Sequence, residues 1–211
     1  MKTQDLITAM AADAMPRPQV GALVARWFLP VLALSGLVAL LVLGVRTDLA
    51  AAMAAPVTAM KSFLPLIVAL AAGFAVLRRA DPARSAGWLV WPLVIVAGLA
   101  ALWFTTTLAG MPADRWWPTA KGQTLFFCLI AIPVIALLPL AVLIAALRSG
   151  ASTAPMRSGA LAGLAAGAGA AAIYAFHCTE DSPLFFLCWY SLGILAVSVA
   201  GAWAGRRWLR W

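Results

Sequence analysis

The sequence carries very little charge: Asp, Glu, Lys and Arg make up 10% of its 211 residues, whereas hydrophobic residues make up 64%. Because a soluble domain usually has about a quarter charged residues, this composition excludes an ordinary soluble fold. Apolar runs of about 20 residues recur along the chain, which is typical of membrane-spanning helices. Residues 1–25 are polar and contain proline, without the apolar core of a secretory signal, so we expect no cleaved leader.

Six apolar segments predict an all-α membrane protein with six transmembrane helices. Their predicted bounds are Trp27–Val45, Phe63–Leu77, Trp88–Leu108, Leu125–Leu147, Ala160–Phe176 and Leu184–Ala204. The second is short, and the apolar stretch from Leu49 would lengthen it. Residues 1–25 would then be a cytoplasmic N-terminal segment, residues 26–205 the transmembrane domain, and residues 206–211 a basic cytoplasmic C-terminus.

The basic residues divide unequally between alternate connections. Eleven lie on the side of the two termini: Lys2, Arg17, Arg26, Arg78, Arg79, Arg84, Arg148, Arg157, Arg206, Arg207 and Arg210. Four lie on the other side: Arg46, Lys61, Arg115 and Lys121. The positive-inside rule therefore places both termini in the cytoplasm. Topology explains the net charge of +8, and with no soluble basic domain we expect no direct nucleic-acid binding.

None of the six predicted segments has an acidic or basic residue in its middle. Proton-coupled transporters usually place carboxylates or histidine there, and most secondary transporters have a polar site at the midplane. The segments also show no obvious inverted repeat. A small-molecule or metal transporter is therefore a weaker alternative.

Cysteine is scarce, with three in the chain, and no CxxC motif is present. This argues against thioredoxin-like and zinc-ribbon sites, and leaves a membrane thiol oxidoreductase as another weak alternative. Cys128 lies near the outer end of the fourth segment, and Cys178 lies just beyond the outer end of the fifth. Antiparallel neighbours would bring them within reach of a disulfide, and if the membrane is a bacterial inner membrane, this side of it is oxidising. Cys188 is interpreted as a small buried hydrophobe.

The run from His177 to Pro183 is the densest cluster of reactive and charged groups in the sequence. His177, the only histidine, could lower a thiol pKa or join Cys128 and Cys178 as ligands of a soft metal ion. Glu180 and Asp181 could add oxygen ligands. The residues themselves leave two interpretations open for the two cysteines, a thiol site or plain core positions.

Other small residues in this half of the chain have packing explanations. Gly159, Gly163 and Gly167 repeat every fourth residue, which predicts close helix packing; a homodimer seam or a sliding surface is the alternative. Ser182 and Pro183 are interpreted as the N-cap and first residue of the sixth helix.

Several motifs together carry a resemblance to a known family. They are Thr3-Gln4-Asp5-Leu6-Ile7, Phe127-Cys128-Leu129, Ala154-Pro155, Gly163 with Gly167, Trp189-Tyr190 and, most specific, the run Tyr174-Ala175-Phe176-His177-Cys178-Thr179-Glu180-Asp181-Ser182-Pro183. Across nearly its whole length the chain resembles the NrsF family of six-span bacterial inner-membrane proteins.

The resemblance implies an anti-sigma factor that holds an extracytoplasmic-function (ECF) sigma factor silent and releases it under heavy-metal or oxidative stress. It implies that Cys128 and Cys178 are the stress-sensing pair. It also implies a regulator without catalysis and without a resident cofactor, with a soft heavy-metal ion as a transient ligand at most.

The N-terminal segment is implied by the same resemblance to contact the sigma factor, here around Asp5, Leu6 and Ile7. As a helix it would place Leu6, Ile7, Met10 and Ala14 on one apolar face. That face could lie in a groove of the sigma factor or rest on membrane lipid as an interfacial anchor.

Overall fold

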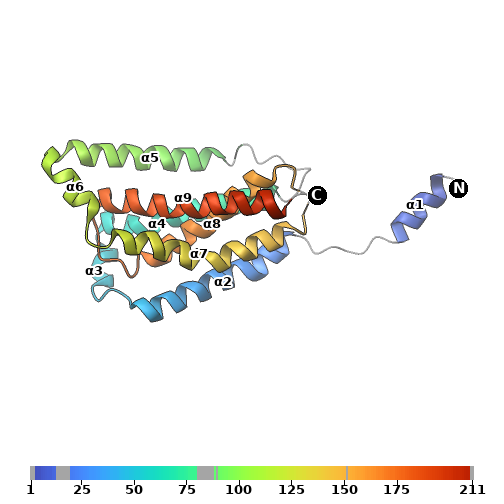
Figure 1. The fold of residues 1–211 in the computed structure, drawn as a ribbon, viewed down its shortest axis with the longest axis horizontal. Helices are drawn as coiled ribbons and strands as arrows, with labels where there is room; N and C mark the ends of the chain where they lie inside the picture. Colours follow the sequence, from blue (N-terminus) through green and yellow to red (C-terminus); the bar gives the residue numbers. More distant parts are fainter. Residues whose placement is uncertain (1–2, 13–19, 80–87, 89, 151, 210–211) are drawn as a thin grey trace.

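The computed structural model describes residues 3–12, 20–79, 88, 90–150 and 152–209. Most of these residues are helical, and six long helices run along the long axis of a bundle (Figure 1). The long helices are α2 (Val20–Leu43), α4 (Pro56–Arg79), α5 (Val90–Ala109), α7 (Leu125–Leu147), α8 (Pro155–Tyr174) and α9 (Pro183–Trp208). The short ones are α1 (Thr3–Ala12), α3 (Leu49–Ala54) and α6 (Ala113–Lys121).

Five of the described helices, α2, α4, α5, α7 and α9, are long and apolar enough to cross a membrane. The chain is therefore an all-α membrane protein. The predicted fifth segment corresponds to α8, which is 20 residues long but is not one of those five. Its many Ala and Gly residues are only weakly apolar, and other helices of the bundle bury them. Six spans and the orientation of the termini stay predictions.

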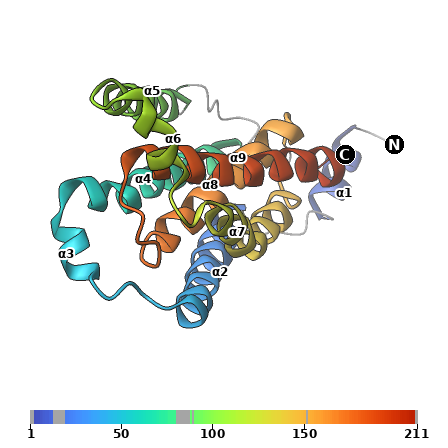
Figure 2. The ribbon, with the colours of Figure 1, turned by 60° about the vertical axis from the view of Figure 1, so that its left-hand side comes forward.

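Helix α8 is the centre of the bundle, in contact with α4, α7 and α9 (Figure 2). A Cβ added at Gly159 or Gly163 would collide with a backbone carbonyl oxygen of α9, that of Gly201 or Val197. Gly167 also faces α9. The predicted glycine face thus packs within the chain, and α9 occupies the surface that a homodimer seam would need.

The first two predicted segments begin too late. Helix α2 starts at Val20, not Trp27, and α4 starts at Pro56, not Phe63, so that Lys61 lies in the second turn of α4 rather than in a connection. Lengthening from Leu49 is wrong, because α3 ends at Ala54 and the next residue has extended backbone. Proline disfavours helical conformation in the residue before it, which explains why α3 and α4 are separate.

The start of the last helix agrees with the sequence in position but not in its cap. Helix α9 begins at Pro183, as predicted, but the Ser182 side chain makes no capping hydrogen bond. Helix α6 was not predicted; it follows α5 at the bundle end that also carries α3 (Figure 1).

The chain termini lie toward the opposite end of the bundle from α3 and α6 (Figure 1). Helix α1 stands apart from the bundle and has no buried residue. Ala14 of its predicted apolar face lies outside the described residues, as do the basic residues Lys2, Arg17, Arg84 and Arg210.

Candidate functional site

Cys128 and Cys178 meet at the end of the bundle that carries α3 and α6. Cys128 is the fourth residue of α7, and Cys178 lies in the loop that joins α8 to α9. Their side chains interact directly, and both are free thiols. Cys128 is 0% exposed and Cys178 is 3% exposed. The helical hairpin thus brings together two sulfurs that are 50 residues apart in sequence.

Two tyrosines, the only two in the chain, surround the thiols. The Cys128 thiol donates to the hydroxyl of Tyr174 over 3.4 Å. The Tyr190 hydroxyl faces Cys178, and forms no hydrogen bond of regular geometry with a described residue. The two phenol rings pack edge to face, with centroids 5.8 Å apart. This aromatic wall keeps bulk water from the sulfurs while leaving polar groups in contact with them.

Arg46, in the connection after α2, holds the loop that carries Cys178. Its guanidinium donates to both carboxylate oxygens of Asp181, over 2.7 and 2.8 Å, and to Asp48 over the same two distances. It also donates to the carbonyl oxygen of Cys178 over 3.2 Å. Bidentate arginine–carboxylate pairs are strong and directional. The Arg46 side chain is only 3% exposed, so this end of the loop is fixed to the segment that follows α2.

Lys61 of α4 makes a second attachment from the other side of the loop. Its ammonium donates to the carbonyl oxygens of Cys178, over 2.5 Å, and Glu180, over 3.0 Å, and to Asp181 over 3.1 Å. The Lys61 side chain is 1% exposed, and a buried cation is tolerated only when it is paired in this way. Two buried cations therefore converge on the backbone carbonyl of Cys178.

The charges at this site change the acidity of the loop groups. The neighbouring Cys128 side chain has the largest effect on Cys178, and together with the charge of Lys61 it outweighs burial and holds the pKa of the Cys178 thiol below its ordinary value. Burial raises the pKa of Asp181, but hydrogen bonds from Arg46 and Lys61 prevail and lower it overall. A hydrogen bond from Arg46 lowers the pKa of Asp48 to about 2. The loop thus favours anionic groups.

His177 does not join the two cysteines as a third ligand. Its Nδ1 lies 2.9 Å from the carbonyl oxygen of Gly44, and its ring packs against the rings of Phe127 and Tyr174. Within the described part of the chain, no three His, Cys, Asp or Glu side chains are grouped to hold a metal ion. The structure therefore does not form the predicted metal site; His177 is a further link between the loop and the end of α2.

The two acidic residues of the loop also serve as attachments. The Glu180 carboxylate accepts a 2.7 Å hydrogen bond from the backbone of Gln123, just before α7. Asp181 is held by Arg46 and Lys61, as described above. Glu180 and Asp181 thus attach the Cys178 loop to three separate segments: the connection after α2, helix α4 and the connection before α7.

The sequence identifies Arg46 and Lys61 only as basic residues that indicate topology, and it does not identify the two tyrosines as site residues. One signal for the tyrosines was present, since both fall within the motif runs around Cys178. No local signal marks Arg46, whose partner Asp181 is 135 residues away. The predicted partner-binding residues Asp5, Leu6 and Ile7 lie on α1, far from the thiols, with Leu6 and Ile7 43% and 56% exposed.

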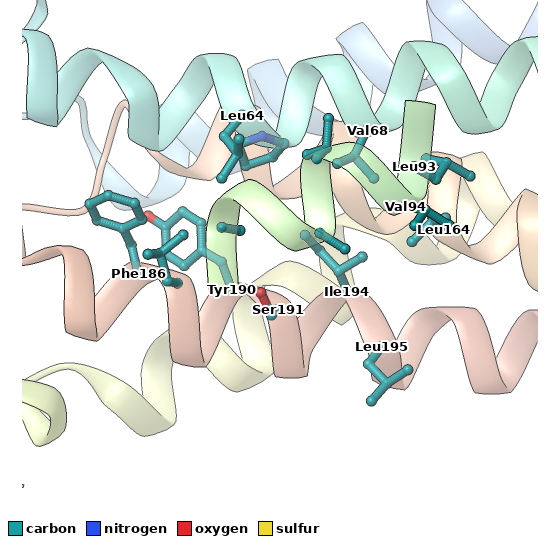
Figure 3. A pocket seen from close by; sticks show the side chains of 15 residues that line it. Leu64, Val68, Leu93, Val94, Leu164, Phe186, Tyr190, Ser191, Ile194 and Leu195 are labelled. Carbon is teal, nitrogen blue, oxygen red and sulfur yellow. The ribbon is translucent and has the colours of Figure 1, made fainter. Parts of the chain in front are cut away.

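An apolar cavity of about 470 Å³ lies between α4, α5 and α9 (Figure 3). Leu64, Val68, Leu93 and Phe186 line it together with Tyr190, and none of its lining residues is charged. Because Tyr190 also contacts Cys178, its side chain separates the cavity from the thiol pair.

Comparison with known proteins gives full-length matches. The family model of NrsF, described as negative regulator of sigma F, matches residues 9–211. The chain is 36% identical over 222 residues to the anti-sigma-F factor NrsF of Caulobacter vibrioides. It is 34% identical over 223 residues to the probable anti-sigma-F factor NrsF of Azospira oryzae. Both comparisons cover 100% of each chain. No solved structure matches the chain.

Proposed function

The chain belongs to the NrsF family of negative regulators of sigma F, a regulatory rather than a catalytic family, and we propose that it is a membrane-bound anti-sigma factor with a thiol sensor. It binds an ECF sigma factor and releases it when Cys128 and Cys178 are oxidised, or when heavy-metal stress acts through the same two thiols. The observation that carries the sensor is the direct contact of two free, buried thiols from different segments.

The proposed topology has six spans in the bacterial inner membrane, with α8 as the fifth, and both termini in the cytoplasm. The unequal division of basic residues supports this orientation. The thiol pair then faces the periplasm, where disulfides persist. The basic residues Arg46 and Lys61, which the positive-inside rule leaves on the periplasmic side, are the two that form the buried ion pairs with Asp181.

A connected set of contacts supports a route from the thiols to the cytoplasm. The Cys178 loop is bonded to the end of α2 through His177 and Arg46, and to α4 through Lys61. A disulfide would fix the loop to α7. A displaced loop would shift α2 through these bonds, and α2 directly follows the N-terminal segment in the chain. The sigma factor must bind the two packings with different affinity for the signal to pass. Near-complete release requires a difference of about 5.5 kcal/mol.

The N-terminal segment is the proposed contact for the sigma factor. Leu6, Ile7 and Met10 expose 43%, 56% and 67% of their surface on α1, and an amphipathic helix of this kind fits an apolar groove of a partner. Its place outside the bundle leaves this face open to a partner (Figure 1).

The experiment that tests the function is co-purification from membranes. The reduced protein should carry a sigma factor, and treatment of the cells with oxidant should release it. Replacing Cys128 and Cys178 together by serine should keep the sigma factor bound under oxidant, while Cys188→Ser should respond like the natural protein. Normal release from the double variant would rule the thiol sensor out.

A further inference from the structure

We propose that the two cysteines have different roles: Cys178 reacts first with a small oxidant such as a peroxide, and Cys128 then closes the disulfide. The proposal rests on the thiol sensing of the proposed function and adds an order of events to it. It makes Cys178 a site of transient oxidation to sulfenic acid.

The cations of the site are placed on the Cys178 side. Lys61 and Arg46 both donate to the carbonyl oxygen of Cys178, over 2.5 and 3.2 Å. The thiolate is the nucleophilic form of cysteine, and neighbouring cations stabilise it. The Tyr190 hydroxyl and the Cys128 side chain lie next to the Cys178 sulfur. Lys61 is the cation whose charge favours the thiolate of Cys178.

The surroundings of Cys128 are neutral. Its sulfur donates to the Tyr174 hydroxyl over 3.4 Å, and the Thr124 hydroxyl lies 3.9 Å away. Among the described residues, no Lys, Arg or His side chain forms a hydrogen bond with it. A sulfur that donates a hydrogen bond is a protonated thiol, which reacts slowly with peroxides and is suited to the second step.

The chemistry balances without a cofactor. The Cys178 thiolate attacks one oxygen of the peroxide, and the O–O bond breaks. The departing hydroxide takes up the proton that Cys178 had released and becomes water. Cys178 is thereby oxidised by two electrons to sulfenic acid, and the peroxide is reduced. The Cys128 sulfur then attacks the Cys178 sulfur. The S–O bond breaks, and the departing hydroxide takes the Cys128 proton to form a second water.

Burial sets which reagents can start the reaction. Cys178 is 3% exposed and sits in a loop next to the exposed Thr179, whereas Cys128 is 0% exposed within α7. A peroxide is little larger than water and reaches such a site after small loop movements. A bulky thiol reagent does not, so the site selects oxidants by size.

The test uses the full-length protein in lipid nanodiscs, with Cys188→Ser in every variant so that only the pair reports. Hydrogen peroxide is added for a set time, the protein is then denatured in the presence of dimedone, which captures sulfenic acid but is too large for the folded site, and the adducts are located by mass spectrometry. In Cys128→Ser the adduct should form at Cys178. In Cys178→Ser, adduct formation at Cys128 should be at least about tenfold slower, because the neutral thiol lacks the cations.

Lys61 provides a second measurement within the Cys128→Ser protein. At a pH below the pKa of the Cys178 thiol, Lys61→Met should slow adduct formation at Cys178 by up to about tenfold, as expected if the pKa rises by one, and Lys61→Arg should restore most of the rate. Lys121→Met is the matched control, since Lys121 is exposed at the end of α6 and should leave the rate unchanged.

Equal or faster adduct formation at Cys128, or no adduct at Cys178, would overturn the order of events, and the two Cys→Ser variants decide this even where Lys61→Met fails to fold. A failure of the proposed function would look different, since the natural protein would form the disulfide in order and yet keep its sigma factor.

Discussion

Replacing Asp181 by asparagine removes the carboxylate that lies between two buried cations. Asp181 accepts hydrogen bonds from Arg46 over 2.7 and 2.8 Å and from Lys61 over 3.1 Å, and the two basic side chains are 3% and 1% exposed. Arg46 keeps Asp48, but Lys61 loses its carboxylate partner. Removing one member of a buried ion pair costs about 3–5 kcal/mol. Since the Asp181 side chain is 35% exposed, we expect a smaller loss, about 2–3 kcal/mol of unfolding free energy.

Lys61→Met is the variant to compare with Asp181→Asn in unfolding free energy. It removes one cation, replaces it by an apolar side chain of similar length, and leaves Asp181 paired with Arg46. The free energy of unfolding should therefore fall by about 1 kcal/mol or less. Both variants would be unfolded reversibly in mixed micelles by a denaturing detergent, with tryptophan fluorescence as the signal.

The same Asp181→Asn protein should also lose the coupling between the thiols and the sigma factor. The Cys128–Cys178 disulfide should still form under oxidant, but the loop would be less firmly bonded to Arg46, so less sigma factor should be released. The reasoning is refuted if Asp181→Asn is as stable as the natural protein, or if Lys61→Met is the more damaging change.

Three further predictions concern other parts of the molecule. Gly163→Ala should destabilise the bundle by about 1–3 kcal/mol, because the added methyl collides with α9; Gly98→Ala, with no atom within 4 Å of the new Cβ, should be neutral or slightly stabilising in the same unfolding assay. Replacing Leu6 and Ile7 together by Asp should weaken sigma-factor co-purification at least about tenfold without changing the unfolding midpoint, since both side chains are exposed on α1; full binding by this variant would remove α1 from the interface. Because the pKa of Cys178 is held below that of an ordinary thiol, its thiolate persists as pH falls, so the peroxide rate should change little between pH about 8 and about 7, where an ordinary thiol slows about eightfold; a stopped-flow pH profile with the ordinary slope would contradict the electrostatics of the site.

The long helices could be predicted because hydrophobic runs report them directly. The bounds of α7, Leu125–Leu147, are those expected from the sequence. The start of α9 at Pro183 was also expected, since proline suits the first turn of a helix. Helix α8 was found as a segment by its apolar pattern, but its central place depends on which helices bury its glycines, and one segment of sequence does not contain that information.

The thiol pair could be predicted in part for a similar reason. A helical hairpin brings its two ends together, so the meeting of Cys128 and Cys178 follows from topology. The ion pairs around them could not be predicted, because Arg46 and Lys61 lie 135 and 120 residues from Asp181 in sequence. The predicted start of the second segment, Phe63, is also seven residues later than the start of α4, so that prediction placed the buried Lys61 in a connection.

The most direct test of the sensor compares two quantities in the same membranes during oxidant treatment. One is the fraction of protein with a Cys128–Cys178 disulfide, measured by mass spectrometry of thiol-blocked peptides, and the other is the amount of sigma factor that co-purifies. We predict that bound sigma factor falls in proportion as the disulfide forms, and returns when the disulfide is reduced. Release of the sigma factor while both cysteines remain as free thiols would contradict the account.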